Sequence, residues 1–343
     1  MNFEKYLDVI NACRFCFMCR HLATLAVVTA KEADTPRGHA LIADRIRMNP
    51  AELAKPDFIA TLYQADLSGA CRTHCVSSYD ETGLVLALRA DIAAAGLAPQ
   101  PVQDLAQEFI HAQFTVDPGD SDLLYYPHPC VELHQPEIAA AFQKLAPAAR
   151  TVSGGDCGKV LSILGFTRES EAVAARFRKA ILAANAKTLV VSSPAAYDFL
   201  KTSGDLPGLD VKLTSEYLLE QPLGIAAVSG KAAFIDSDFL RRYQTNDAPR
   251  RLLASLGVMA TPFGTNSEES YACGEGSMPI IRLYPALVAK MAGRVAELAE
   301  RHGVETIITP SPYTKYALKL FAPQVNVMAL EEVAASARPM NRT

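Results

Sequence analysis

Cysteines gather in two short runs near the N-terminus of this chain of 343 residues. The first run places Cys13, Cys16 and Cys19 at C-x2-C-x2-C spacing, and the second places Cys71 and Cys75 at C-x3-C spacing. Thiolates at C-x2-C-x2-C spacing are typical ligands of a 4Fe–4S cluster, and soft sulfur suits iron better than oxygen donors do. The pattern therefore predicts iron–sulfur chemistry, with a zinc site or a group of buried free cysteines as the alternatives.

The fourth ligand is predicted by a rule of two-cluster proteins, in which the last cysteine of each run binds the cluster of the other run. By this rule Cys75 joins Cys13, Cys16 and Cys19 in one complete ligand set. The reciprocal set keeps only Cys71, so we predict one intact 4Fe–4S site and one lost site. The lost set has other residues where cysteines would stand, and the Pro that usually follows each fourth ligand is also replaced: Ala23, Ala65 and Ser68, then Thr24 and Val76.

The composition predicts a globular, cytoplasmic protein. Half of the residues are hydrophobic, and 33 basic and 37 acidic side chains give a net charge of −4, which argues against a nucleic-acid partner. We expect no transmembrane segment and no signal peptide, so any association with a membrane would be peripheral and through a partner. We also expect no bound nicotinamide or flavin, because no G-x-G-x-x-G motif follows a strand. Free thiolates for a cluster predict a reducing compartment.

The order of expected elements divides the chain into a helical part and two α/β units. Residues 1–112 have helical periodicity, including a helix start at Thr35-Pro36. Two similar successions of strand, helix, Cys-Gly turn, helix and strand then follow, in 113–222 and in 223–335, before a tail at 336–343. Buried strands at 188–193 and 306–310 each end at Pro, which favours two pseudo-repeated units with parallel strands.

Motifs along nearly the whole chain resemble those of the iron–sulfur subunits that partner FAD-linked dehydrogenases. That family includes the glycolate oxidase iron–sulfur subunit, the anaerobic glycerol-3-phosphate dehydrogenase C subunit and the lactate-utilisation A protein, which share CCG domains with heterodisulfide reductase. The resemblance is carried by Cys13-Arg-Phe-Cys16-Phe-Met-Cys19-Arg-His, Thr35-Pro-Arg-Gly, His-Pro-Cys130, Gly-Gly-Asp-Cys157-Gly, Ser193-Pro-Ala-Ala196, Ile235-Asp-Ser-Asp238, Ala248-Pro-Arg-Arg-Leu-Leu, Ala272-Cys273-Gly-Glu-Gly and Ser311-Pro-Tyr-Thr314.

The resemblance implies a fold of the α + α/β type: a helical ferredoxin-like domain at 1–112 and two CCG-type units with degenerate motifs. It also implies that the protein carries single electrons from an FAD-linked dehydrogenase subunit to a further acceptor. The Cys-Cys-Gly of the family is Asp156-Cys157-Gly158 in the first unit and Ala272-Cys273-Gly274 in the second, and further ligand positions have become Ser, Ala, Asp or Thr. A second cluster is therefore not expected.

Several residues remain open to a second interpretation. Cys130, Asp156 and Cys157 could form a small zinc or thiol site, but we favour a packed turn because the neighbouring ligand positions are now Ser and Ala. We interpret Cys71 as a spare thiol, Cys273 as a small buried hydrophobic residue, and Asp238 as a solvated or helix-capping side chain. Three side chains near the cysteines are candidates to tune a cluster electrostatically: Arg14, Arg20 and His74.

Our hypothesis is a subunit that transfers electrons through one 4Fe–4S cluster, with the degenerate units as a docking body. The alternatives are a scaffold or assembly subunit without a redox role, and a zinc- or thiol-dependent enzyme at Cys130 and Cys157.

Overall fold

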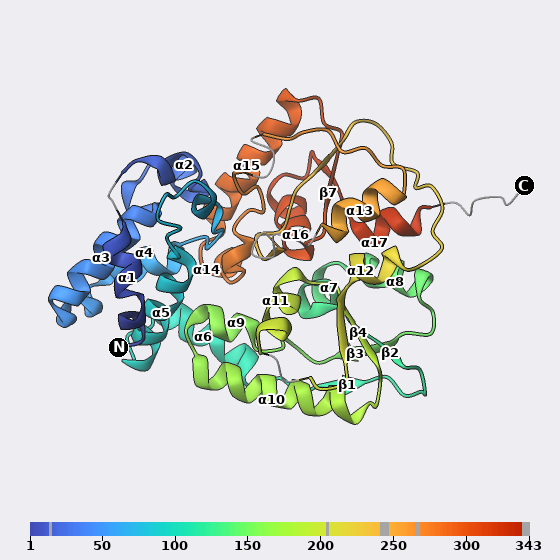
Figure 1. Cartoon of the computed structure of the whole chain (residues 1–343), viewed down its shortest axis with the longest axis horizontal. Helices are drawn as coiled ribbons and strands as arrows, with labels where there is room; N and C mark the ends of the chain where they lie inside the picture. The colour runs from blue at the N-terminus through green and yellow to red at the C-terminus, as the bar shows by residue number, and fades with distance from the viewer. Residues whose placement is uncertain (14–15, 204–205, 241–246, 265–267, 338–343) are drawn as a thin grey trace, which may run out of the picture.

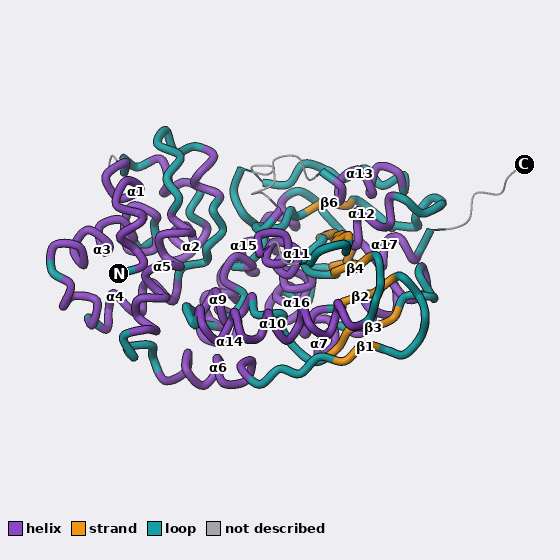
Figure 2. The backbone as a smooth tube through the Cα atoms, turned by 60° about the horizontal axis from the view of Figure 1, so that its bottom comes forward, coloured by secondary structure: helices purple, strands orange, loops and turns teal. Residues whose placement is uncertain are grey.

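The protein combines a group of N-terminal helices with two mainly parallel sheets that are flanked by helices (Figure 1). This computed structural model describes residues 1–13, 16–203, 206–240, 247–264 and 268–337. Figure 2 shows the N-terminal helices at one end of the molecule and the strands in the other part. The prediction of a mixed α/β protein with parallel strands is confirmed, whereas the ferredoxin-like character of the N-terminal helices stays a prediction.

The N-terminal helices start where the sequence supplies caps. The Thr35 hydroxyl accepts a hydrogen bond from the Gly38 amide at 3.0 Å, and Asp80 Oδ1 accepts one from the Gly83 amide at 3.2 Å. Pro36 stands at the first position of its helix, where its missing N–H costs nothing. The elements are α1 (Leu7–Ala12), η2 (Met18–His21), α2 (Thr24–Thr29), α3 (Pro36–Met48), α4 (Pro56–Gln64), η5 (Ala70–Thr73), α5 (Glu81–Ala94) and α6 (Gln100–Ile110).

The first sheet has the strand order β1-β3-β2-β4-β5. Its strands run parallel except the two-residue edge strand β1, which pairs antiparallel with β3. Except for the half-buried Leu123, the aliphatic and aromatic residues of β2 and β4 are fully buried, because helices cover the faces of the sheet. The elements are β1 (Thr115–Val116), β2 (Leu123–Tyr126), α7 (His128–His134), α8 (Pro136–Leu145), β3 (Arg150–Ser153), α9 (Lys159–Leu164), α10 (Thr167–Ala183), β4 (Thr188–Val191), α11 (Pro194–Ser203), β5 (Asp210–Leu213) and α12 (Thr214–Leu219).

The second sheet repeats the central part of the first with the order β6-β7-β8, all parallel. An isolated parallel bridge between Ala233 and Thr261 stands where β3 would pair with β2 in the first sheet. The elements are β6 (Ala232–Phe234), α13 (Ala248–Ser255), η7 (Glu275–Ser277), α14 (Ile280–Leu283), α15 (Pro285–Arg301), β7 (Thr306–Thr309), α16 (Pro312–Phe321), β8 (Asn326–Ala329) and α17 (Leu330–Ala335).

The repeat extends to the helix that follows the last strand of each sheet. Glu216 accepts a hydrogen bond from the Leu213 amide at 2.8 Å before α12, and Glu332 accepts one from the Ala329 amide at 2.7 Å before α17. Each carboxylate satisfies an amide that the helix itself leaves unpaired. The two successions of elements predicted from the sequence are therefore present, with β1, β3, β5 and β8 as strands that the prediction lacked.

The N-terminal helices pack directly on the Cys-Gly turn of the second unit. The Thr24 hydroxyl donates to the Ser270 carbonyl at 2.9 Å, and Arg89 donates to the Ser277 hydroxyl at 3.1 Å. A Cβ added to Gly276 would lie 2.2 Å from the Leu67 carbonyl oxygen, so the two backbones touch here. This junction is part of one hydrophobic core that both parts of the chain share.

Replacing Gly276 with Ala should weaken this junction. The added methyl group overlaps backbone atoms that cannot rotate away, so we expect a loss of about 2 kcal/mol in the free energy of unfolding, measured by urea denaturation. Gly293→Ala is the matched control, because nothing lies within 4 Å of its added Cβ. Gly293 lies in α15, where alanine is the better helix former, so the control should be neutral or stabilising by up to about 1 kcal/mol. Equal stabilities of the two variants would contradict the close contact.

Candidate functional site

A cavity of about 800 Å³ brings together the five N-terminal cysteines. Cys13, Cys16 and Cys19 reach it from the first run, and Cys71 and Cys75 from the second. Two segments more than fifty residues apart in sequence thus supply thiols to one space. The candidate ligands predicted from the sequence all line this cavity, and so does Cys71.

Short turns rather than long helices position these thiols. Cys13 directly follows α1, and Cys19 lies in η2. Cys75 closes the turn after η5, where its amide donates to the Cys71 carbonyl at 3.1 Å. The Cys71 thiol donates to the Cys19 carbonyl at 3.2 Å, which joins the two cysteine runs.

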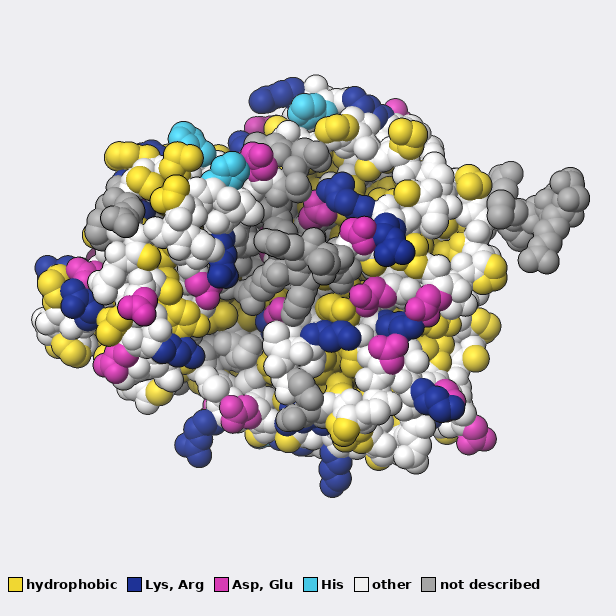
Figure 3. Space-filling model, viewed as in Figure 1, with side chains coloured by type: hydrophobic (Ala, Val, Ile, Leu, Met, Phe, Trp, Pro, Cys, Tyr) yellow, Lys and Arg dark blue, Asp and Glu magenta, His cyan; other side chains and the backbone are white. Residues whose placement is uncertain are grey.

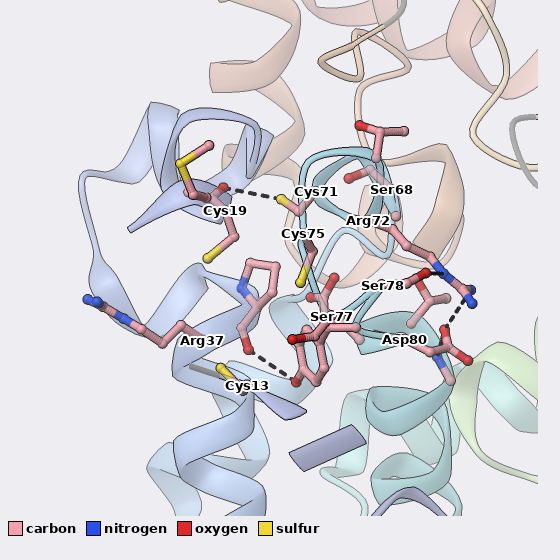
Figure 4. A pocket seen from close by; sticks show the side chains of 18 of the residues that line it. Cys13, Cys19, Arg37, Ser68, Cys71, Arg72, Cys75, Ser77, Ser78 and Asp80 are labelled. Carbon is pink, nitrogen blue, oxygen red and sulfur yellow. Dashed lines mark hydrogen bonds and ion pairs between the residues drawn. The ribbon is translucent and has the colours of Figure 1, made fainter. Parts of the chain in front are cut away.

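The cysteine side chains point in different directions. Figure 4 shows the sulfur atoms of Cys13, Cys19 and Cys75 around one space, whereas the sulfur of Cys71 turns to the Cys19 carbonyl. Cys71 is buried, Cys13, Cys19 and Cys75 are half-buried, and Cys16 is exposed. The arrangement distinguishes one buried, hydrogen-bonded thiol from four thiols with access to the cavity.

The pKa values of two thiols support this distinction. Burial, reinforced by the carboxylates of Glu81 and Asp66, raises the pKa of Cys71 far above its usual value. Burial also raises the pKa of Cys19, but the backbone N–H of Arg37 donates to that sulfur and acts in the opposite direction. Arg37 follows Pro36 at the N-terminus of α3, where amides are left unpaired by the helix. Helix α3 therefore offers a donor for a thiolate at Cys19.

The charged side chains proposed as tuners have partners of their own. Arg20 Nη1 lies 3.7 Å from Glu32, and His74 Nε2 lies 3.6 Å from Glu268. Arg14 lies outside the described residues. The charge of Arg20, next to Cys19 in sequence, is therefore already shared with a surface carboxylate.

The second unit also contributes to the cavity, through Asp238. Of the two interpretations of Asp238, the solvated side chain is wrong. Its side chain is buried, Oδ1 accepts a hydrogen bond from the Ser270 hydroxyl, and Oδ2 accepts one from the Gly276 amide at 3.3 Å. The sequence singles out the motif Ile235-Asp-Ser-Asp238, but it does not place Asp238 beside the cysteines, because only the folded chain brings these segments to one cavity.

The group Cys130, Asp156 and Cys157 is held by hydrogen bonds within the first unit and its neighbour. Asp156 Oδ1 accepts from the amides of Gly158 and Val160 at 2.8 and 2.9 Å, and Oδ2 lies 3.3 Å from His128 Nε2. The Cys130 sulfur lies 3.8 Å from the Pro312 carbonyl oxygen, and Cys157 is buried in the core of the first sheet. These contacts are those expected of a packed turn.

The remaining altered motif positions of the second unit are also packed. The Ser311 hydroxyl accepts from the Thr314 amide at 3.1 Å and caps α16, and the Thr314 hydroxyl donates to the Ala272 carbonyl at 3.2 Å. Cys273 is buried, and burial raises the pKa of its thiol. The side chains here satisfy backbone groups of the fold.

Over the described part of the chain, no set of three or more His, Cys, Asp or Glu side chains is arranged to hold a metal ion. Ligands of a cluster bind separate iron atoms, so they lie farther apart than ligands of one ion. Five cysteine side chains around one cavity, with an amide donor at Cys19, are a donor set that suits iron–sulfur chemistry.

The comparisons with known proteins bear on the fold alone. No protein-family model and no curated protein matches the chain. A hypothetical protein from Helicobacter pylori has a similar crystal structure, with a TM-score of 0.64 and 10% identity over 100% of this chain and 76% of that chain. An aspartate racemase homologue from Pyrococcus horikoshii OT3 gives a TM-score of 0.28 and 11% identity over 62% of this chain and 96% of that chain, which is too low to support any conclusion. No helix among the described residues has both the length and the apolar character needed to cross a membrane.

Proposed function

We propose that this protein is an electron-transfer subunit with one 4Fe–4S cluster in a ferredoxin-like helical domain at residues 1–112. The observation that carries the proposal is the convergence of five cysteines, from two runs far apart in sequence, on one cavity. The cluster would be held by Cys13, Cys16, Cys19 and Cys75, and it would supply one-electron chemistry.

The chain's own residues would shape that site. Cys71 remains a neutral thiol and holds the Cys19 carbonyl, so the two ligand runs keep their relative positions. The Arg37 amide donates to the Cys19 sulfur and thereby stabilises its thiolate form. Reduced thiolates of this kind are consistent with our proposed location in the cytoplasm.

An apolar rim at the cavity suggests where a partner would bind. Met18 and Val76 line the cavity and are 50% and 87% exposed, and Phe17 beside them is 62% exposed. Figure 3 shows hydrophobic side chains gathered on the surface of the N-terminal part. An FAD-linked dehydrogenase subunit docked on this rim would deliver electrons close to the cysteines, and the two α/β units would extend the docking body toward a further acceptor.

Anaerobic purification followed by reconstitution with iron and sulfide tests the proposed function. We expect about four iron and four sulfide per chain and a broad visible absorption that bleaches with dithionite. A colourless protein without iron after reconstitution would contradict the proposal and favour a scaffold without a redox role.

A further inference from the structure

Four buried carboxylates, two from the N-terminal helical part and two from the second unit, lie at or near the cysteine cavity. Glu81 and Asp238 line the cavity, Asp66 lies near both of them, and Glu275 lies near Asp238. Their exposed fractions are only 8% for Glu81 and Asp66, 4% for Asp238 and 1% for Glu275. Four ionised carboxylates at such depth would be costly, so some of them must hold protons or hydrogen bonds.

Hydrogen bonds connect Asp238 and Glu275, the two carboxylates that belong to the second unit. Glu275 Oε2 accepts from the Asp238 amide at 2.7 Å, and Oε1 accepts from the Ser237 hydroxyl at 2.9 Å. Asp238 in turn accepts from the Ser270 hydroxyl and the Gly276 amide. The path from the cavity wall to Glu275 therefore consists of hydroxyl, amide and carboxylate groups.

Two buried atoms of the N-terminal helical part have no hydrogen-bond partner among the described residues: Asp66 Oδ2 and His39 Nε2. The opposite atoms of the same side chains are engaged, since Asp66 Oδ1 accepts from the Ser68 amide at 3.3 Å and His39 Nδ1 lies 2.7 Å from Glu81. Asp66 is 8% exposed and His39 is 1% exposed, so bulk water reaches neither side chain freely. Both atoms are positions where a proton or a water molecule could bind.

The groups that face Asp66 and Glu275 are mostly acidic or neutral. Glu81, Asp238 and His39 act on Asp66, and the thiol of Cys71 lies near it. Arg89 is the buried cation nearby, but its guanidinium donates to carbonyl groups and to the Ser277 hydroxyl. Asp238, Tyr313 and the hydroxyls of Ser237 and Ser311 face Glu275. Among the described residues, no ion pair joins Asp66 or Glu275 to Lys or Arg.

Burial and neighbouring charges favour the protonated forms of Asp66 and Glu275. Burial, together with Glu81 and Asp238, raises the pKa of Asp66 to about 7. Burial and the Asp238 carboxylate raise the pKa of Glu275 to about 8. Both carboxyl groups therefore change charge near neutral pH, where a small change in the local field alters their proton occupancy.

We propose that Asp66 and Glu275 form a proton-binding site, so that the arrival of an electron at the cysteine site is coupled to uptake of a proton. This inference rests on the proposed function, and it adds proton transfer as a further activity. One electron from the reduced flavin of the partner would add one negative charge to the cluster that Cys13, Cys16, Cys19 and Cys75 would hold, and would leave the flavin oxidised by one electron. One proton from solvent then forms an O–H bond with a buried carboxylate, and the same proton leaves when the electron passes to the acceptor.

The midpoint potential of the reconstituted protein, measured by EPR-monitored titration between pH 6 and 9, tests this coupling. At acid pH the carboxyl groups are protonated in both redox states, so the potential should be constant. Above about pH 7 the oxidised protein has lost the proton that the reduced protein binds, so the potential should fall as pH rises. One proton for each electron corresponds to a slope of about 59 mV for each tenfold change in proton concentration.

Amide variants should remove the slope without removing the cluster. Asp66→Asn and Glu275→Gln cannot change charge, so the pH dependence should become flatter in each. Glu331→Gln is the matched control: burial raises the pKa of Glu331 to about 7 as well, but Glu331 lines a separate small cavity beside Ser192 and Thr214. The control should keep the slope of the natural sequence.

The outcomes separate the two proposals. A protein that contains iron but shows a potential independent of pH overturns the proton coupling and leaves the electron-transfer function standing. An unchanged slope of potential against pH in both Asp66→Asn and Glu275→Gln also overturns the proton coupling and leaves the electron-transfer function standing. A protein that binds no iron overturns both. The measurement on the natural sequence is decisive even where a variant fails to fold.

Discussion

Cys75→Ala is expected to abolish the proposed 4Fe–4S cluster, whereas Cys71→Ala is expected to keep it. Both cysteines lie in the same five-residue turn and line the same cavity, so the pair is closely matched. Cys75 presents its sulfur to the space around which Cys13 and Cys19 lie, as Figure 4 shows. Cys71 instead donates its thiol hydrogen to the Cys19 carbonyl, and burial keeps it protonated. A ligand must be a thiolate, so Cys75 is the better fourth ligand.

Iron and sulfide analysis of both variants after anaerobic reconstitution measures the difference. We expect near-complete loss of iron for Cys75→Ala and iron close to four per chain for Cys71→Ala. Cys71→Ser adds a control for the hydrogen bond, because its hydroxyl can still donate to Cys19. Equal loss of iron in the alanine variants, or loss in Cys71→Ala alone, would overturn the ligand assignment.

Arg89→Met is expected to destabilise the whole protein, on the order of 3–5 kcal/mol in the free energy of unfolding. The Arg89 guanidinium is almost fully buried and binds three separate parts of the fold. It donates to carbonyls at the end of α4 and after it, to a carbonyl in α9, and to the Ser277 hydroxyl of the second unit. These acceptors are Leu62 at 2.9 Å, Tyr63 at 3.3 Å, Ala65 at 3.0 Å, Ile163 at 3.1 Å and Ser277 at 3.1 Å.

Methionine preserves much of the apolar stem, so the loss would come from carbonyl groups left without donors. Arg47→Met provides the control, since Arg47 is exposed and pairs with Asp44 on the surface of α3. That change should stay within about 0.5 kcal/mol. Urea denaturation followed by circular dichroism compares the two. Similar midpoints would show that Arg89 does not join the parts of the fold.

Local signals in the sequence predicted the elements that depend on local chemistry. The Thr35-Pro36 pair predicted the start of α3, and the apolar run at 188–191 predicted β4. Strand β5 was not predicted because Asp210–Leu213 alternates polar and apolar residues over only four positions. Strand β8 was missed for a similar reason, since Asn326 begins a four-residue segment that only its neighbour β7 completes.

The candidate site also contains some residues that local sequence patterns predicted and others that they did not. The spacing of Cys13, Cys16 and Cys19 predicted the side of the cavity that one short segment forms. Arg89 could not be predicted, because nothing in its neighbouring residues reveals a role, and the motif Ile235-Asp-Ser-Asp238 did not place Asp238 at the cavity. Their positions follow from contacts between segments far apart in sequence, which only the folded chain determines.

Asp238 on the cavity wall also has a consequence for dissecting the molecule. A fragment that ended near residue 112 would keep every thiol of the cavity but would lose the Asp238 side, and with it the surface that covers Asp66 and Leu67. Carboxyl groups now shielded would then meet bulk water, and their proton affinity would return toward that of free side chains. The shortest fragment that keeps the whole lining of this cavity is therefore longer than the cysteine spacing suggests, and a fragment cut near residue 112 would expose carboxyl groups that the full chain shields.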